Sequence, residues 1–125
     1  MIPQLTKAEE QIMQIMWNLE ESTVQNIREK FNPPKPARTT IATVLGILEN
    51  KGFVTHKTLG RINVYYPSVD KKSYSKSQLM GVIKNYFNNS FTSMALFFAK
   101  EKNLTIEQLD ALFEEAKEKL KTEEQ

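Results

Sequence analysis

One arginine and three threonines stand close together between residues 37 and 51. Arg38, Thr39, Thr40 and Thr43 fall in the first turns, on the small polar side of a helix that the apolar spacing of this segment predicts. A guanidinium group binds phosphate or the edge of a guanine, and threonine contacts a base methyl group or a phosphate. These residue types point to recognition of a nucleic acid, with Arg38 as the first candidate contact.

Basic residues are concentrated in two segments, although the net charge of the 125-residue chain is only +2. Residues 35–61 contain five basic residues and one acidic residue, and residues 71–100 contain five lysines and no acid. Acidic residues predominate before residue 35 and after residue 100, and they cancel most of this charge in the total. Local positive charge of this kind favours a polyanionic partner.

The residues offer little for catalysis or metal binding. The chain has no cysteine and a single histidine, His56, which excludes disulfides, thiolate metal sites and multi-histidine metal sites. It has no glycine-rich phosphate loop, and Glu114, Glu115 and Glu118 fall on a predicted solvated helix face. We therefore predict that the protein is not an enzyme and that it needs no cofactor or metal.

Three helices are predicted before residue 52. Residues 6–9 have the form of a capping box, which opens a helix of about 14 residues, and residues 22–25 form a second box that opens a short helix. The third helix spans residues 37–51 and ends at Gly52, where a left-handed residue is expected. These helices must position the polar side chains described above.

A β-hairpin follows over residues 53–67, because two runs of β-branched and aromatic residues flank Gly60. Three helices and a hairpin in this order indicate a winged helix-turn-helix, in which the third helix enters the major groove and the hairpin lies on the DNA backbone. The fold adds Lys51, Lys57 and Arg61 to the candidate DNA-binding residues. An alternative stays open, in which the winged helix binds a protein and the charge only aids solubility.

Three more helices are predicted after residue 70, opened by caps at Asp70, Ser90 and Thr105, with residues 122–125 frayed. The fifth helix, residues 91–99, is apolar on nearly all sides, which indicates burial in the fold or at an interface. We therefore expect a winged-helix domain over residues 1–70 and a helical dimerisation region over residues 71–125. The expected dimer contacts are Leu79, Ile83, Phe87, Phe91, Met94, Phe98, Leu109, Leu112 and Phe113.

Neither a signal peptide nor a membrane span is indicated by the sequence. The longest apolar stretch runs from residue 94 to residue 99, far below the roughly 20 residues that a span requires. We therefore expect a cytoplasmic protein without membrane insertion.

Several short motifs follow one another at characteristic spacing. They include Leu5-Thr6-Lys7-Ala8-Glu9, Ala37-Arg38-Thr39-Thr40-Ile41, Lys51-Gly52-Phe53 and Val64-Tyr65-Tyr66-Pro67. In this order they resemble the penicillinase-repressor family, the BlaI, MecI and CopY group of bacterial transcriptional repressors. The resemblance implies a homodimeric repressor that binds a palindromic, double-stranded DNA operator through an N-terminal winged helix.

The resemblance also implies a mode of release. In antibiotic-responsive members of the family, a membrane sensor-protease triggers cleavage in the helix before the last, which by alignment places the bond between Phe97 and Phe98. The family pattern at this bond is Asn-Phe, so Phe97 departs from it, and the absence of cysteine excludes the mode of copper sensing that uses a C-terminal cysteine cluster. Ala42 and Ile47 replace longer polar and basic residues, so we expect Thr39, Thr40 and Thr43 to read the bases.

Overall fold

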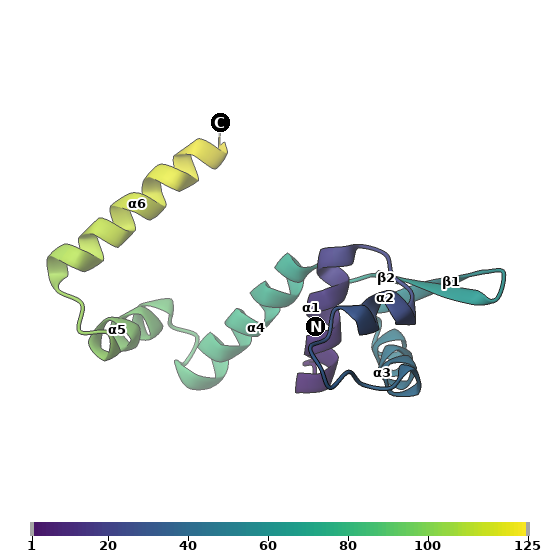
Figure 1. The fold of residues 1–125 in the computed structure, drawn as a ribbon. Coiled ribbons are helices and arrows are strands. Elements are labelled where there is room, and N and C mark those ends of the chain that lie inside the picture. The colour runs from purple at the N-terminus through teal and green to yellow at the C-terminus, as the bar shows by residue number, and fades with distance from the viewer. Residues whose placement is uncertain (1, 125) are drawn as a thin grey trace. The chain divides into compact units, whose positions relative to one another are not determined.

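The computed structural model describes residues 2–124, which form helices and a single two-stranded antiparallel sheet (Figure 1). The elements follow in the order α1 (Lys7–Leu19), α2 (Val24–Glu29), α3 (Arg38–Asn50), β1 (Val54–Leu59), β2 (Ile62–Pro67), α4 (Lys71–Tyr86), α5 (Phe91–Glu101) and α6 (Ile106–Glu124). This order confirms the predicted winged helix followed by further helices. None of the described helices has the length and apolar character needed to cross a membrane.

The chain divides into two compact units, an N-terminal unit that ends at Leu79 and a C-terminal unit that begins at Met80. Helix α4 contributes to both units, so its first turns are described with the N-terminal unit. A functional boundary near residue 70 stays a prediction.

The N-terminal unit has one hydrophobic core between its helices and the base of the hairpin. Met13 and Met16 of α1, Ile27 of α2 and Leu45 of α3 are completely buried, as is Phe53 just before β1. Each such side chain stabilises the fold by about 1.5–3 kcal/mol through removal of apolar surface from water. The apolar stripes that the sequence predicts are therefore the buried faces of these helices.

The helix caps agree with the sequence at α1 and differ at α2. At α1, the Thr6 amide donates to Glu9 Oε1 at 2.9 Å and the Glu9 amide donates to Thr6 Oγ1 at 3.2 Å. At α2 the N-cap is Thr23, which exchanges the same pair of hydrogen bonds with Asn26, so the prediction of a box over residues 22–25 was wrong. Ser22 is instead buried in a backbone bridge to Tyr65, which holds it extended and delays the helix by one residue.

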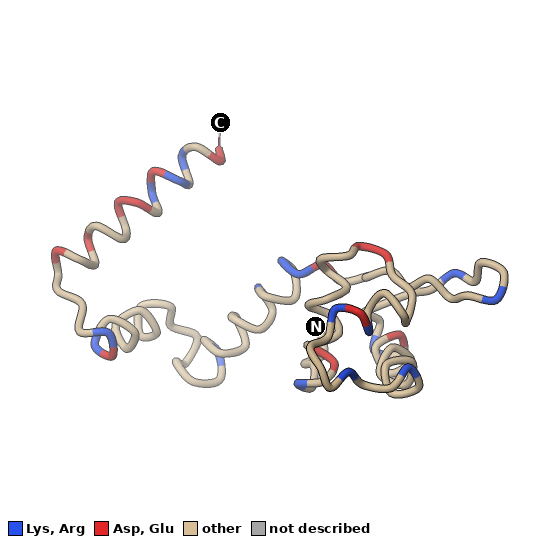
Figure 2. Tube along the Cα trace, viewed as in Figure 1, with Lys and Arg blue, Asp and Glu red and all other residues tan. Residues whose placement is uncertain are grey.

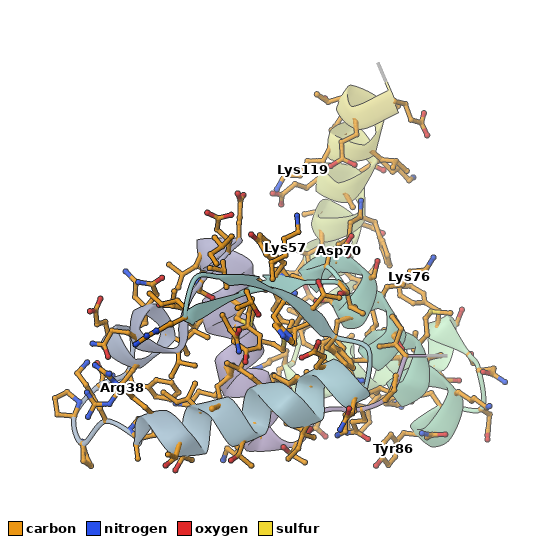
Figure 3. All side chains as sticks on the ribbon, turned by 90° about the vertical axis from the view of Figure 1, so that its right-hand side faces the viewer. Arg38, Lys57, Asp70, Lys76, Tyr86 and Lys119 are labelled. Atoms are coloured by element: carbon orange, nitrogen blue, oxygen red, sulfur yellow. The ribbon has the colours of Figure 1, made fainter. Side chains whose placement is uncertain are left out.

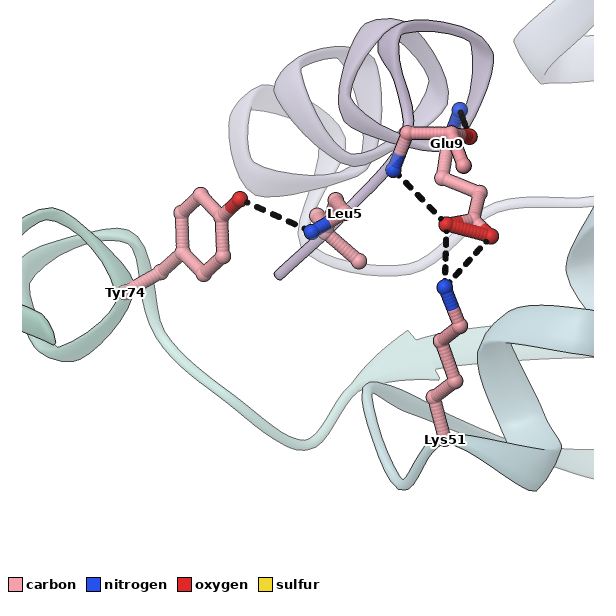
Figure 4. Close-up of polar contacts among 5 residues, drawn as sticks. Leu5, Glu9, Lys51 and Tyr74 are labelled. Atoms are coloured by element: carbon pink, nitrogen blue, oxygen red, sulfur yellow. Dashed lines mark hydrogen bonds and ion pairs between the residues drawn. The ribbon is translucent and has the colours of Figure 1, made fainter. Parts of the chain in front are cut away.

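The first turns of α4 belong to the core of the N-terminal unit. The buried Tyr74 hydroxyl accepts a hydrogen bond from the Leu5 amide at 3.2 Å (Figure 4), and its ring packs edge-on against Phe53. Trp17 donates from Nε1 to the Val69 carbonyl at 2.8 Å. Asp70 caps α4 as predicted, and the hydrogen bonds from the Ser73 hydroxyl and amide hold the pKa of Asp70 below its usual value.

The C-terminal unit contains the rest of α4 and the helices α5 and α6. Ser90 caps α5 and Thr105 forms a capping box with Gln108 at α6, both as predicted. The expectation that residues 122–125 fray was wrong as far as Glu124, which is still helical; Gln125 lies outside the described residues. Ion pairs three and four residues apart, such as Lys121 with Glu118, support this last stretch of helix.

A buried ion pair joins the start of α1 to the end of α3 (Figure 4). Lys51 Nζ lies 2.6 and 3.0 Å from the two carboxylate oxygens of Glu9, whose side chain is only 5% exposed. Burial by itself raises the pKa of Glu9, but the hydrogen bonds and charge of Lys51 and the hydrogen bonds from Thr6 outweigh it and hold the pKa below 4.5. Folding therefore favours the ionised carboxylate.

This pair predicts a specific loss of stability in acid. Because the pKa of Glu9 is lowered on folding, its contribution is complete above its unfolded value and declines as the pH falls below about 4.5. Glu9→Gln should reduce the free energy of unfolding by about 1–3 kcal/mol at neutral pH and flatten its decline in acid. Urea denaturation between about pH 3 and pH 7, at fixed protein concentration, measures both effects.

The matched control is Glu10→Gln, which changes the exposed neighbour in the same turn and should keep the wild-type pH profile. An acid profile of Glu9→Gln as steep as that of the wild type would contradict the assignment.

Candidate nucleic-acid interface

The first turn of α3 presents a cation and unpaired backbone amides to solvent. Arg38, Thr39 and Thr40 are all exposed, and the N-cap residue Ala37 supplies no side-chain acceptor for the first amides. Figure 3 shows α3 with Arg38 at its start. Free amides and a guanidinium at a helix N-terminus suit an anion.

Thr43 continues this exposed face one turn later. Its hydroxyl donates to the Thr39 carbonyl at 2.9 Å, which leaves its lone pairs and its methyl group facing outward. All four residues that the sequence singles out on α3 therefore lie on its solvent side. The opposite side of the helix is buried through Ile41, Leu45 and Leu48.

The hairpin, which we call the wing (β1, β2 and the turn between them), carries the other exposed cations. Arg61 occupies the turn after Gly60, whose φ of +66° is a conformation that glycine adopts without strain. Lys57 lies on β1 with its Nζ 5.8 Å from the centre of the Tyr66 ring. Figure 2 shows basic positions and no acidic position along the wing, so nothing on it offsets this charge.

A hollow of about 350 Å³ lies between α2, the start of α3 and the wing. Two guanidinium groups from distant parts of the chain, those of Arg38 and Arg61, line it together. The remaining lining residues are Thr23, Val24, Gln25, Ala42, Ile62, Asn63 and Tyr65. Two arginines with hydroxyl and amide groups around them form a setting in which a phosphate group is well held.

Sequence reasoning missed the polar lining of this hollow. Thr23 and Gln25 lie in the predicted capping motif and Asn63 lies in a predicted strand, so neither pattern marks them as binding residues. Gln25 Oε1 is buried without a hydrogen-bond partner in the described structure. The register of the hairpin would have indicated Asn63. In that register Asn63 lies opposite Thr58, and its Oδ1 accepts a hydrogen bond from the Thr58 hydroxyl at 2.8 Å.

The other basic groups of residues 35–61 are engaged within the chain. Lys51 is paired with the buried Glu9, and Lys35 Nζ donates to carbonyl groups at the end of α2, including that of Phe31 at 2.7 Å. In contrast, no ion pair between residues 2 and 124 involves Arg38, Lys57 or Arg61. The structure therefore brings Arg38 and Arg61 together at the hollow and sets Lys51 apart.

The predicted dimer residues gather mainly around one apolar groove in the C-terminal unit. Ile83 is buried within the chain and Phe87 packs against Phe97, whereas Leu79 is exposed at the end of the N-terminal unit. The groove has a volume of about 260 Å³ between α5 and α6. Six predicted residues line it: Phe91, Met94, Phe98, Leu109, Leu112 and Phe113.

Helix α5 is not buried by its own chain. Phe91, Phe97 and Phe98 are each more than 50% exposed. The predicted burial of this helix within its own fold is therefore not seen in the described residues, and its place at an interface stays a prediction. Phe97 and Phe98, which flank the predicted cleavage bond, lie inside α5 rather than in an extended loop.

Comparisons with known proteins agree with this geometry. The family model described as penicillinase repressor matches residues 5–118. The chain is 29% identical over 114 residues to the penicillinase repressor of Bacillus licheniformis, which covers 90% of this chain and 89% of that protein. It is 26% identical over 110 residues to the methicillin resistance regulatory protein MecI of Staphylococcus aureus (strain N315), with 87% and 89% covered.

The same comparison extends to a solved structure. The solution structure of the DNA binding domain of the repressor BlaI superposes with a TM-score of 0.51 at 29% sequence identity. The match covers 59% of this chain and 92% of that domain.

Proposed function

The chain belongs to the penicillinase repressor family, and from that premise we propose that it is a homodimeric repressor of a palindromic operator. Its relatives are transcriptional repressors and not enzymes. The proposal places the protein in the cytoplasm, where bacterial operator DNA is found. It assigns DNA contact to the N-terminal unit and dimerisation to the C-terminal unit.

The observation that carries the proposal is the hollow that Arg38 and Arg61 share beside the exposed face of α3. With α3 in the major groove, a backbone phosphate enters this hollow and the wing lies along the same strand. Thr39, Thr40 and Thr43 then face the base edges, where their methyl and hydroxyl groups contact thymine methyls and polar atoms. Lys57 adds a phosphate contact from the wing.

The exposed groove between α5 and α6 supports the dimeric part of the proposal. Leu112 and Phe113 are 48% and 44% exposed in the chain, as expected for apolar residues whose partner is a second copy. A twofold dimer presents two copies of α3 in opposite directions, and a palindromic operator follows from that symmetry.

Release by proteolysis between Phe97 and Phe98 is a further part of the proposal, with a membrane sensor-protease as partner. Both residues are half-exposed, but a protease binds extended backbone, so α5 must open before this bond is cut. Mass spectrometry of the protein from antibiotic-treated cells tests this step. A fragment that ends at Phe97 is expected, and an intact chain in derepressed cells would exclude cleavage as the release step.

The DNA contacts predict a strong and specific salt dependence. A duplex recovered by selection from a random library should contain inverted half-sites, and its affinity should fall steeply with salt because phosphate contacts release counterions. Arg38→Ala and Arg61→Ala should each weaken binding about tenfold and reduce the logarithmic salt slope by about 1. Fluorescence anisotropy over a salt series measures both quantities.

The matched control is Lys102→Ala, an exposed cation of the C-terminal unit, which should leave affinity and slope unchanged. Failure to select any duplex at low salt, or wild-type affinity in the Arg38→Ala, Arg61→Ala double variant, would overturn the proposal. Failure to select any duplex would also favour the alternative of a winged helix that binds protein.

The groove predicts which apolar residues hold the dimer. Phe98→Ser combined with Leu112→Ser should convert the full-length dimer to a folded monomer, because both side chains are about half-exposed in the single chain. Ile106→Ser changes a residue of α6 that is 77% exposed and lies outside the groove, and it should leave the dimer intact. Light scattering measures the oligomeric state of each variant, and circular dichroism measures whether it is folded. A double-serine variant that is still a dimer would refute the assignment.

A further inference from the structure

The wing is attached to the helices along one row of residues near its base. Tyr65 of β2 exchanges two backbone hydrogen bonds with Ser22, at 3.0 and 2.8 Å, and His56 of β1 stands opposite Tyr65 in the register. The His56 and Tyr65 rings contact each other with centres 5.4 Å apart. Ser22 thus holds β2 to the segment between α1 and α2. His56 occupies the same row on the neighbouring strand, β1.

His56 continues this row to α3. Its Nδ1 lies 2.9 Å from both carboxylate oxygens of Glu49, in the last turn of α3. Between this row and the tip of the wing, no hydrogen bond or ion pair joins the wing to a helix in the part of the chain that the structure describes. The pair is therefore the outermost polar attachment of the wing to the recognition helix.

The tip of the wing lies far from this attachment, so a small change in angle at the attachment displaces the tip. Three residue steps separate the His56 row from Leu59 at the tip, or about 10 Å at the usual rise of a strand. A tilt of about 10° at the row moves the tip by about 2 Å, which is enough to break a hydrogen bond from Arg61. A single exposed contact of this kind adds little to stability, so its effect on the hollow lined by Arg38 and Arg61 has to come from geometry.

Among residues 2–124, Glu49 is the only charged partner of His56. From α3 the carboxylate of Glu49 faces it, and from β2 the ring of Tyr65 does. On its own strand, Lys57 extends over Tyr66. The nearby Lys51 is bound to Glu9, so it does not compete for Glu49.

We propose that Glu49 and His56 are positioning residues that hold the wing at the angle required for Arg61 to share a phosphate with Arg38. The inference rests on the proposed DNA-binding function. They do so through the contact between Nδ1 of His56 and the carboxylate of Glu49, which ties β1 to the last turn of α3.

Two measurements on the full-length protein test the proposal. Affinity for the selected duplex should fall about threefold in Glu49→Gln and in His56→Ala, because the contact between α3 and the wing is weakened. His56→Asn keeps an N–H donor for Glu49, so it should bind better than His56→Ala. In an Arg61→Ala background, His56→Ala should cause no further loss, because the phosphate contact that it positions is already absent.

The second measurement needs no DNA. The ¹⁵N heteronuclear NOE of the Lys57, Thr58 and Leu59 amides should fall in Glu49→Gln and His56→Ala relative to the wild type at about pH 5.5. Unchanged values, or a further loss of affinity from His56→Ala in the Arg61→Ala background, would overturn the positioning role. A different result separates the two ideas. If the NOE values fall in the variants but the wild-type protein binds no duplex, the positioning role stands and the proposed DNA-binding function is overturned.

Discussion

The burial of one side of α3 is the constraint on which the rest of the N-terminal unit depends. Ile41, Leu45 and Leu48 are completely buried, and they fix the rotation of the helix about its axis. Rotating the helix to hide its threonines would expose these apolar groups at a cost of several kcal/mol. The core therefore presents Arg38 and the threonines outward. The ion pair of Glu9 with Lys51 then fixes the far end of the same helix.

Local features of the fold were predictable because they depend on neighbours in the sequence. The cap of α1 and the left-handed Gly52, with a φ of +83°, follow from hydrogen bonds and backbone preferences within a few residues. The cap of α2 was not predictable in the same way. Its start depends on the bridge between Ser22 and Tyr65, and no local pattern reports a partner more than 40 residues away.

The candidate site shows the same division between local and distant contacts. Arg38 and Arg61 are identifiable from residue type and element order, but the hollow between them requires the register of the wing and the position of α2. Net charge was also an incomplete guide. Lys35 and Lys51 contribute to the positive segment in the sequence, yet the structure uses them to satisfy helix-end carbonyls and a buried carboxylate.

The position of Phe97 and Phe98 has a consequence for how a cut there would act. Every residue of the hollow and of the exposed face of α3 precedes residue 66, whereas the groove begins at Phe91. In the proposed dimer, a cut after residue 97 would spare each proposed DNA contact and would remove only the linkage between the two N-terminal units. The second half-site would then no longer be met at the high effective concentration that a joined pair provides. Repression would end through lost avidity, with the intrinsic affinity of each half unchanged.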